Sequence, residues 1–414
     1  MATSTQQAPP GLEPIEGNVV APVRFLAAGV ACGIKESGAP DLTLIYSEVP
    51  GAVAGTFTTN RMCAAPVQVS REVVARGTAQ CIVANSGNAN CATGEQGLAD
   101  AREMARLAAQ HVGCAPDATL VASTGKIGVP MPMEQVRRGI VGAATRLGRD
   151  AECAEIASRG IMTTDTVAKQ IAVQLPIGGR IVRLGGIAKG AGMICPNMAT
   201  MLCFITTDAA VEGPTLQRAL SEAVDASFNR ITIDGDMSTN DTVILLANGC
   251  AENAPIRDEG SPEFGQFLAA LRFVTTHLAR AIARDGEGAT KLIEIRVEGA
   301  RAADEAHRIA KSIANSPLVK TALHGADPNW GRIASSAGAA GVDFRQQDLR
   351  IWFDDLIVAD GGAAGDYDDE AAHQILLNDE YTIRVAVGDG PGTATVWSCD
   401  LSREYIAINA EYRT

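Results

Sequence analysis

A single hydroxyl group stands out in the stretch from 189 to 204, which reads KGAGMICPNMATMLCF. Thr200 lies there between a glycine-containing turn and an apolar segment typical of a buried strand. A threonine hydroxyl is a weak nucleophile at neutral pH unless a base beside it accepts its proton. An N-terminal threonine carries such a base itself, because its α-amine has a reference pKa of about 7.7–8.0. One chemistry that fits the stretch is therefore a threonine nucleophile released by a cut between Ala199 and Thr200.

That cut requires no second protein. The Thr200 hydroxyl attacks the Ala199 carbonyl, the acyl group moves from nitrogen to oxygen, and water hydrolyses the resulting ester. Gly190, Gly192 and Pro196 suit a loop that strains the peptide bond. A threonine at the start of a buried strand is also ordinary β-branched packing, so the stretch alone leaves both interpretations open.

Other chemistries find little support in the motifs. The five histidines show no metal-ligand spacing to one another or to a cysteine pair. The segment DGDMSTND from Asp234 has Thr239 where a calcium loop needs glycine and Leu245 where it needs glutamate. The segment STGKIG has Ile127 where a phosphate-binding loop needs serine or threonine. We therefore expect no metal and no nucleotide cofactor.

Composition limits the partners. The chain has 414 residues, a hydrophobic content of 46% and a net charge of −13. A nucleic acid or an anionic membrane surface would need a basic face, so small-molecule partners are favoured. No apolar run reaches the roughly 18 residues of a membrane span, and the first residues lack the pattern of a signal peptide. We expect a soluble cytoplasmic protein whose ten cysteines are reduced.

Hydrophobic periodicity predicts an α+β fold, with antiparallel-rich sheets packed against helices. The C-terminal segment 381–412 alternates apolar and polar residues around glycine-rich turns, which predicts an antiparallel meander. The other predicted elements are strands at 41–48 and 80–85, a hairpin at 170–186 with its turn at 176–179, and helices at 98–112, 213–228, 262–284, 302–314 and 366–377.

Several longer motifs, in order along the chain, resemble one family. The segment KGAGMICPNMATML resembles the self-cleavage site of the ornithine acetyltransferases of arginine biosynthesis, also called bifunctional glutamate N-acetyltransferases. The resemblance continues through NSGNAN, STGKIGVPMP, RITIDGDMSTNDT, DGEGATKLIE, SPLVKTALHGADPNWGRI and INAEYRT. It implies an α/β sandwich with a site like that of N-terminal-nucleophile hydrolases. It also implies an α chain of residues 1–199 and a β chain of residues 200–414, assembled as a heterotetramer of two of each.

The resemblance also implies residue roles. Thr200 would take the acetyl group from N-acetylornithine and pass it to glutamate, with its α-amine as base. The Thr124 hydroxyl and the Gly125 N–H would form the oxyanion hole, although relatives commonly carry an apolar residue where this chain has Lys126. Lys189 suits a substrate carboxylate, and Glu287 suits the ornithine amine. The substrate-binding positions that match the family are Thr163, Lys189, Thr200, Glu287, Asn409 and Thr414.

Several alternatives stay open at this point. The same threonine would serve an amidohydrolase or aminopeptidase in which water accepts the acyl group. In a non-catalytic globular protein it would remain an internal residue. The family implies no cofactor, but acetyl-CoA as a second acetyl donor is left open. The segment NSGNAN is either a structural turn or a functional loop, and DPNWGRI receives no role.

Overall fold

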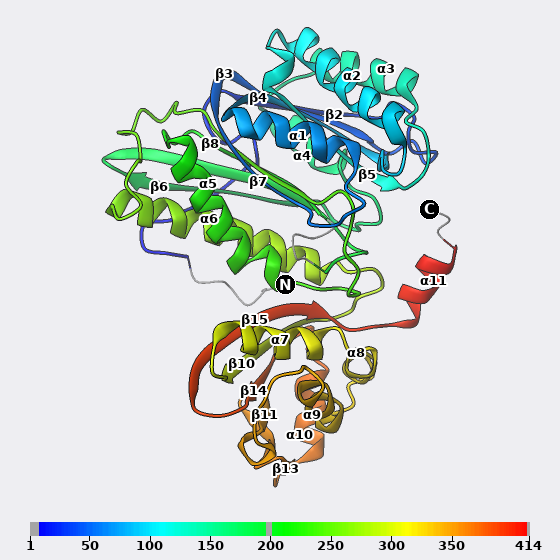
Figure 1. The fold of residues 1–414 in the computed structure, drawn as a ribbon, viewed down its shortest axis with the longest axis vertical. Coiled ribbons are helices and arrows are strands. Elements are labelled where there is room, and N and C mark those ends of the chain that lie inside the picture. The colour runs from blue at the N-terminus through cyan, green and yellow to red at the C-terminus, as the bar shows by residue number, and fades with distance from the viewer. Residues whose placement is uncertain (1–7, 196–200, 412–414) are drawn as a thin grey trace. The chain divides into compact units, whose positions relative to one another are not determined.

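The computed structural model describes residues 8–195 and 201–411, which form two compact units (Figure 1). Among these residues, the larger unit comprises those up to Asn229 and those from Met237 to Ile282. The smaller unit comprises Arg230–Asp236 and the residues from Ala283 onward. The units thus divide the chain elsewhere than at the bond between residues 199 and 200, so the predicted α and β chains do not coincide with the compact units.

The larger unit contains a mixed sheet with the strand order β1-β6-β7-β8-β9-β3-β4-β5, and β2 also pairs with β3. The pairs β4–β5 and β8–β9 are parallel and the other pairs are antiparallel. The described strands are β1 (Glu13–Ile15), β2 (Phe25–Val30), β3 (Leu42–Phe57), β4 (Thr78–Asn88), β5 (Thr119–Lys126), β6 (Lys169–Ile177), β7 (Arg180–Lys189), β8 (Leu202–Thr207) and β9 (Thr242–Ala247).

The long strand β3 joins two parts of this sheet. Its first part pairs with β2, and its pairing with β4 continues past a register shift between Tyr46 and Gly51. Its last residues, from Ala52 to Phe57, pair with β9. One apolar cluster takes Ile45 and Ile82 from the first part and Phe204 and Ile244 from the second. The strand layers lie between α1–α3 on one side and α5 and α6 on the other (Figure 1). The predicted α+β fold and sandwich are confirmed.

The helices of this unit begin and end where local chemistry favours it. Pro66 lies in the first turn of α1, and Gly77 ends that helix with a φ of 78° that suits glycine. None of the described helices of either unit is both long and apolar enough to cross a membrane. The helices here are α1 (Ala65–Arg76), α2 (Gly94–Val112), α3 (Met133–Ala144), α4 (Ala151–Arg159), α5 (Gly213–Ala226) and α6 (Pro262–Arg284), which confirm the predicted helices at 98–112, 213–228 and 262–284.

The predicted hairpin is formed by β6 and β7. Gly178 and Gly179 make its turn with φ values of 56° and 78°, the left-handed conformation of a tight two-residue hairpin loop. Pro176 pairs with Ile181 in the ladder and so lies outside the turn. Strand β8 pairs with β7 on its other side, and the register places Leu202 opposite Lys189. The predicted cut therefore falls in the connection between two neighbouring antiparallel strands.

The smaller unit has a six-stranded sheet with the order β13-β12-β11-β14-β10-β15. Its strands are β10 (Leu292–Gly299), β11 (Arg350–Phe353), β12 (Leu356–Asp360), β13 (Ala363–Ala364), β14 (Glu380–Ala386) and β15 (Gly390–Cys399). Its helices are α7 (Ala303–Ala314), α8 (Pro317–His324), α9 (Trp330–Gly338), α10 (Asp369–Leu376) and α11 (Arg403–Glu411), so the predicted helices near 302–314 and 366–377 are confirmed.

The predicted C-terminal meander is wrong. Strands β14 and β15 do not pair with each other, because β10 lies between them, parallel to β14 and antiparallel to β15. Residues Arg403–Glu411 form helix α11 and no strand. Alternation of apolar and polar residues indicates a half-buried strand but does not say which strand lies beside it. The connection from β14 to β15 passes the end of β10 at a close backbone contact between Gly388 and Gly299. A Cβ on Gly299 would lie 2.0 Å from the Gly388 oxygen, so this contact leaves no room for a side chain.

A second glycine pair ends the parallel strands β4 and β5. Gly87 lies opposite Gly125, which has a φ of 131°. A Cβ on Gly125 would lie 2.4 Å from the carbonyl carbon of Gly87 and 2.5 Å from the nitrogen of Asn88. A side chain here would force the two backbones apart, so position 125 requires glycine for both space and conformation.

We expect Gly125→Ala to lower the free energy of unfolding by about 1–3 kcal/mol, because alanine would be strained at this φ and would collide with the backbone of β4. The matched control is Gly142→Ala in α3, where a Cβ meets no atom within 4 Å. Alanine favours a helix interior, so the control is expected to stabilise by roughly 0.5–1 kcal/mol. Thermal unfolding of both variants beside the wild type checks this. Equal stability of the two variants would contradict the backbone argument.

Candidate active site

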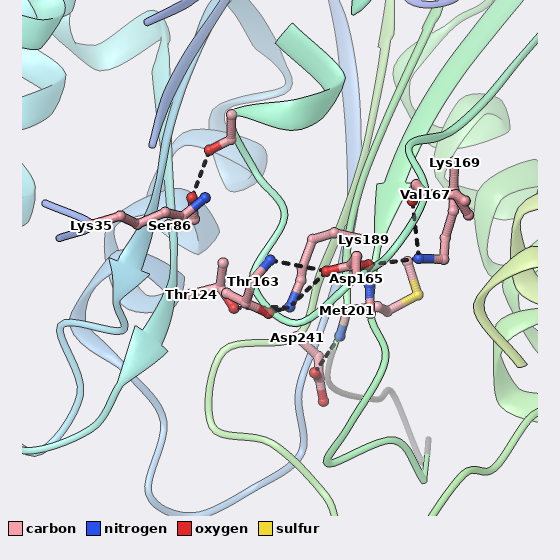
Figure 2. A network of polar contacts seen from close by, with 12 residues as sticks. Lys35, Ser86, Thr124, Thr163, Asp165, Val167, Lys169, Lys189, Met201 and Asp241 are labelled. Carbon is pink, nitrogen blue, oxygen red and sulfur yellow. Dashed lines mark hydrogen bonds and ion pairs between the residues drawn. The ribbon is translucent and has the colours of Figure 1, made fainter. Parts of the chain in front are cut away.

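A buried carboxylate between two lysines forms the centre of a polar network in the larger unit (Figure 2). The Asp165 side chain has no solvent exposure, and the side chains of Lys169 and Lys189 are 1% and 4% exposed. Lys169 Nζ donates to Asp165 Oδ1 at 2.7 Å, and Lys189 Nζ lies 3.9 Å from Oδ2. The backbone N–H groups of Gly190 and Thr163 donate to the same carboxylate at 2.7 and 3.0 Å. Asp165 thus links the start of β6, at Lys169, to the end of β7, at Lys189.

Charge keeps this network ionised. Burial alone would raise the pKa of Asp165, but the ammonium groups of Lys189 and Lys169 outweigh it and hold that pKa well below its usual range. A buried charge is tolerated when it is paired and hydrogen-bonded, as this one is. Two lysine side chains thus share one buried carboxylate.

Lys189 brings together three residues that the sequence assigns to the site. Its Nζ donates to the Thr163 hydroxyl oxygen at 2.6 Å and to the Thr124 hydroxyl oxygen at 3.4 Å. Lys189 is the last residue of β7, Thr124 lies near the end of β5, and Thr163 follows α4. The predicted substrate-binding residues Thr163 and Lys189 therefore lie beside the predicted oxyanion-hole residue Thr124 (Figure 2).

The end of β5 is held by amide side chains around Thr124 and Gly125. The Ser123 hydroxyl donates to Asn85 Oδ1 at 2.6 Å. Asn240 Nδ2 donates to the Ser123 carbonyl at 2.9 Å and to the Ala89 carbonyl at 2.6 Å. Rigid support of this kind is what an oxyanion hole needs, because its donors act without reorganising during the reaction.

The segment NSGNAN is part of that support. Asn85 Nδ2 donates to the Asn88 carbonyl at 2.9 Å, and Asn88 Nδ2 donates to the carbonyls of Val129 and Pro130 at 3.1 Å. Asn90 Nδ2 donates to the Gly97 carbonyl at 2.8 Å. These amides bond to protein groups, which favours the structural interpretation of the motif.

A third lysine adds positive potential to the network. The pKa of Lys35 is lowered to about 8, mainly by burial and also by the neighbouring Lys189 ammonium. The carboxylates of Asp41 and Asp165 act in the opposite direction. Lys35 Nζ donates to the Pro40 carbonyl at 2.7 Å. Lys35 is labelled near Ser86 in the close view of the network (Figure 2).

A second buried carboxyl group lies at the start of β8. Asp241 Oδ1 accepts a hydrogen bond from the Met201 N–H at 2.9 Å, and the Asp241 residue is 1% exposed. Burial raises its pKa well above the usual range, although the Met201 N–H and the Lys189 ammonium act in the opposite direction. Met201 is the residue that follows Thr200 in the sequence.

The remaining predicted site residues fall in two groups. Glu287 and Asn409 lie in the smaller unit, where Asn409 Nδ2 donates to Glu287 Oε2 at 2.7 Å. Asn409 lies on α11, and Tyr405 of the same helix donates to Asp234 Oδ2 at 3.2 Å. The predicted cleavage residues Ala199 and Thr200 and the substrate-binding residue Thr414 lie outside the described residues.

Sequence reasoning missed Asp165, Lys169 and Asp241. A single acidic residue between polar neighbours is more often a solvated surface charge than a buried one. The four-residue spacing of Asp165 and Lys169 is typical of surface ion pairs and gives no sign of burial. Asp241 ends the segment DGDMSTND, which the sequence analysis weighed for calcium binding and as part of a family motif without giving Asp241 a role.

Comparison with known proteins finds a family match over nearly the whole chain. The model of the ArgJ family matches residues 26–414. A Symbiobacterium thermophilum protein named Arginine biosynthesis bifunctional protein ArgJ is 49% identical over 405 residues, covering 97% of this chain and 100% of its own. A protein of the same name from Synechococcus sp. is 50% identical over 410 residues, covering 97% of this chain and 98% of its own.

A solved structure carries the same name. The crystal structure of Arginine biosynthesis bifunctional protein argJ from Bacillus halodurans is 43% identical, covers 50% of this chain and 97% of its own, and has a TM-score of 0.48. The family match and the identity to the two relatives agree with the ordered motifs of the sequence. This chain belongs to the ArgJ family of arginine-biosynthesis proteins.

Proposed function

We propose that the protein transfers the acetyl group of N2-acetyl-L-ornithine to L-glutamate through an acetyl-Thr200 intermediate, giving ornithine and N-acetylglutamate. The observation that carries the proposal is the buried Lys189, which links Thr163 and Thr124 and whose register partner Leu202 lies two residues after Thr200. In a member of the ArgJ family, this arrangement supports a nucleophile at residue 200 beside an oxyanion hole at Thr124 and Gly125.

The chemistry proceeds in two acyl transfers. The Thr200 hydroxyl attacks the acetyl carbonyl while the α-amine accepts its proton, and ornithine leaves with a proton on its nitrogen. Negative charge develops on the carbonyl oxygen, where the Thr124 hydroxyl and the Gly125 N–H would donate hydrogen bonds. The glutamate amine then attacks acetyl-Thr200 and restores the free hydroxyl.

The lysine cluster favours this reaction electrostatically. Lys189 lies 3.4 Å from the Thr124 hydroxyl oxygen and is almost fully buried. A fixed ammonium group in a site of low dielectric stabilises an oxyanion without solvent rearrangement. Lys189 also suits the carboxylate of an amino-acid substrate, and Glu287 with Asn409 suits the cationic amine of ornithine.

The sheet explains how two fragments would stay together. Strand β8, which would begin the β chain, pairs with β7 of the α chain, and β9 of the β chain pairs with β3 of the α chain. A cut before Thr200 would leave both of these strand pairs in one sheet. We propose that the two chains remain associated and that two of each assemble as a heterotetramer.

The assay that tests the function follows the acetyl group of acetylornithine. Addition of glutamate should produce N-acetylglutamate and ornithine in equal amounts, because the acyl group passes from one amine to the other. Release of acetate with no dependence on glutamate would support the amidohydrolase alternative and contradict transfer. Parallel assays with acetyl-CoA as the donor decide whether the protein uses that second donor.

Self-cleavage should yield fragments of 199 and 215 residues, the second beginning with TMLCFITTDA. Thr200→Ala should remain one chain and be inactive, because it removes the hydroxyl that performs both steps, whereas Thr200→Ser retains a hydroxyl and should cut slowly. Intact-mass analysis of the three purified proteins measures the cut. A Thr200→Ala protein that is cleaved and active would contradict the proposed nucleophile.

Thr124→Ala should lower kcat for acetyl transfer by about 10²–10³, the usual effect of removing one oxyanion-hole donor. Binding of acetylornithine should change much less, because the lost bond forms mainly in the transition state. Steady-state kinetics with a separate binding measurement distinguish the two effects. Thr119→Ser is a matched control, since Thr119 is a buried hydroxyl at the other end of β5. A kcat for Thr124→Ala equal to that of the control would remove Thr124 from the reaction.

A further inference from the structure

Glu287 and Asn409, the pair whose chemistry suits a cationic amine, come from two separate segments of the smaller unit. Glu287 lies in the connection between α6 and β10, and Asn409 lies on α11, none of whose residues is buried. A helix without buried side chains gains little from apolar packing, so polar contacts near its start matter more for its position. The groups that hold these two segments therefore decide the geometry of the pair.

The carboxylate of Asp400 holds the segment that carries Glu287. Asp400 Oδ1 accepts the backbone N–H groups of Thr290 and Lys291 at 2.8 and 2.9 Å, and the Thr290 hydroxyl donates to Oδ2 at 2.6 Å. The Asp400 side chain has no solvent exposure. Burial would raise its pKa, but its hydrogen bonds, including those with Thr290 and His324, outweigh burial and lower the pKa. A buried carboxylate thus fixes the backbone shortly after Glu287.

Asp400 is itself anchored by helix α8. A hydrogen bond of 2.6 Å joins Asp400 Oδ2 to Nδ1 of His324, the last residue of that helix. Lys320 of the same helix donates through Nζ to the Ser398 hydroxyl oxygen at 3.0 Å, and its carbonyl accepts the Leu401 N–H at 3.2 Å. His324 and Lys320 belong to the motif SPLVKTALHGADPNWGRI. Through Asp400, this motif supports the segment DGEGATKLIE, which contains Glu287.

Ser402 bonds to both segments at once. Its hydroxyl donates to the Gly288 carbonyl at 2.6 Å, and its Oγ accepts the N–H of Glu404, in the first turn of α11, at 3.1 Å. An oxygen that accepts an N–H of the first turn caps a helix. Gly288 has a φ of 67°, and a Cβ on it would lie 2.7 Å from Ser402 Oγ, so the approach requires glycine. One hydroxyl thus ties the residue after Glu287 to the start of α11.

We propose that Asp400 and Ser402 are positioning residues for recognition of the ornithine side-chain amine, because they set Glu287 against Asn409 before the substrate binds. The inference rests on the proposed function, in which Glu287 binds that amine. Asn409 Nδ2 donates to Glu287 Oε2 at 2.7 Å and so orients the carboxylate. A carboxylate that is already oriented loses less side-chain entropy when it pairs with an ammonium group.

The test compares acetylornithine with N2-acetylnorvaline, an acetyl donor whose side chain has the same carbon atoms and no amine. Amine selectivity is the ratio of kcat/KM for acetylornithine to that for acetylnorvaline, each measured with glutamate as acceptor. Ser402→Ala should lower this ratio by about threefold to tenfold, the usual effect of one lost hydrogen bond. The change should appear mainly in KM for acetylornithine, because the amine contact forms before the chemical step.

Two variants of Asp400 separate position from charge. Asp400→Ala leaves the N–H groups of Thr290 and Lys291 without their acceptor, so it should lower the selectivity at least as much as Ser402→Ala. Asp400→Asn keeps an Oδ1 that can accept both N–H groups, so it should retain most of the selectivity. An equal loss in these two variants would show that the negative charge of Asp400 acts on the amine, and would overturn the positioning role.

Ser312→Ala is the matched control. The Ser312 hydroxyl donates to the Ser336 carbonyl at 2.7 Å and joins α7 to α9 within the smaller unit. The variant loses the same kind of bond as Ser402→Ala, so it should lose similar stability and keep the wild-type selectivity. A selectivity of Ser402→Ala equal to that of this control would overturn the inference and leave the proposed function intact.

A double variant decides the case if Asp400→Ala does not fold. Because Ser402 acts through Glu287, adding Ser402→Ala to Glu287→Gln should lower the selectivity no further than Glu287→Gln does alone. A further loss would contradict the inference. A wild type that transfers the acetyl group without preferring the amine would overturn the inference alone, whereas a wild type that transfers no acetyl group from acetylornithine to glutamate would overturn the proposed function.

Discussion

The buried ion cluster of Asp165 with Lys169 and Lys189 is the interaction on which the site depends. Removing the carboxylate would take away the negative charge that balances two buried ammonium groups, which is far more costly than losing a surface ion pair. The same carboxylate accepts the N–H of Gly190 and so holds the first residue after β7. It thereby sets where Lys189 meets Thr124 and where the connection toward β8 starts.

Two rigid elements converge on this cluster from different parts of the chain. The end of β5 is held by the Asn85 and Asn240 amides and by the close contact of Gly87 with Gly125. The end of β7 is held by Asp165, and the start of β8 by the Asp241 carboxyl. These hydrogen bonds and the glycine contact hold the strand ends in place, so the groups that would bind and polarise the substrate are positioned before it arrives. Within the smaller unit, Glu287 and Asn409 form a separate hydrogen-bonded pair whose chemistry suits a cation.

The sequence by itself determined the family, most of the elements and the kind of chemistry. The ordered motifs identify the family, and apolar periodicity placed hairpin β6–β7 and the long helices, because these signals are local along the chain. It also selected Thr124, Thr163 and Lys189 through the resemblance, and the structure brings those three together. Ala199, Thr200 and Thr414 lie outside the described residues, so their roles stay predictions.

Only the tertiary structure decided which strands are neighbours and which charges are buried. Alternating residues suggested that β14 and β15 form a meander, yet β10 lies between them, because strand pairing is a long-range choice that a local pattern does not encode. Asp165 and Asp241 look like surface acids in the sequence. Their environments follow from burial among residues far away in the chain. Two neighbouring ammonium groups hold the pKa of Asp165 well below its usual range, whereas burial raises the pKa of Asp241 well above it.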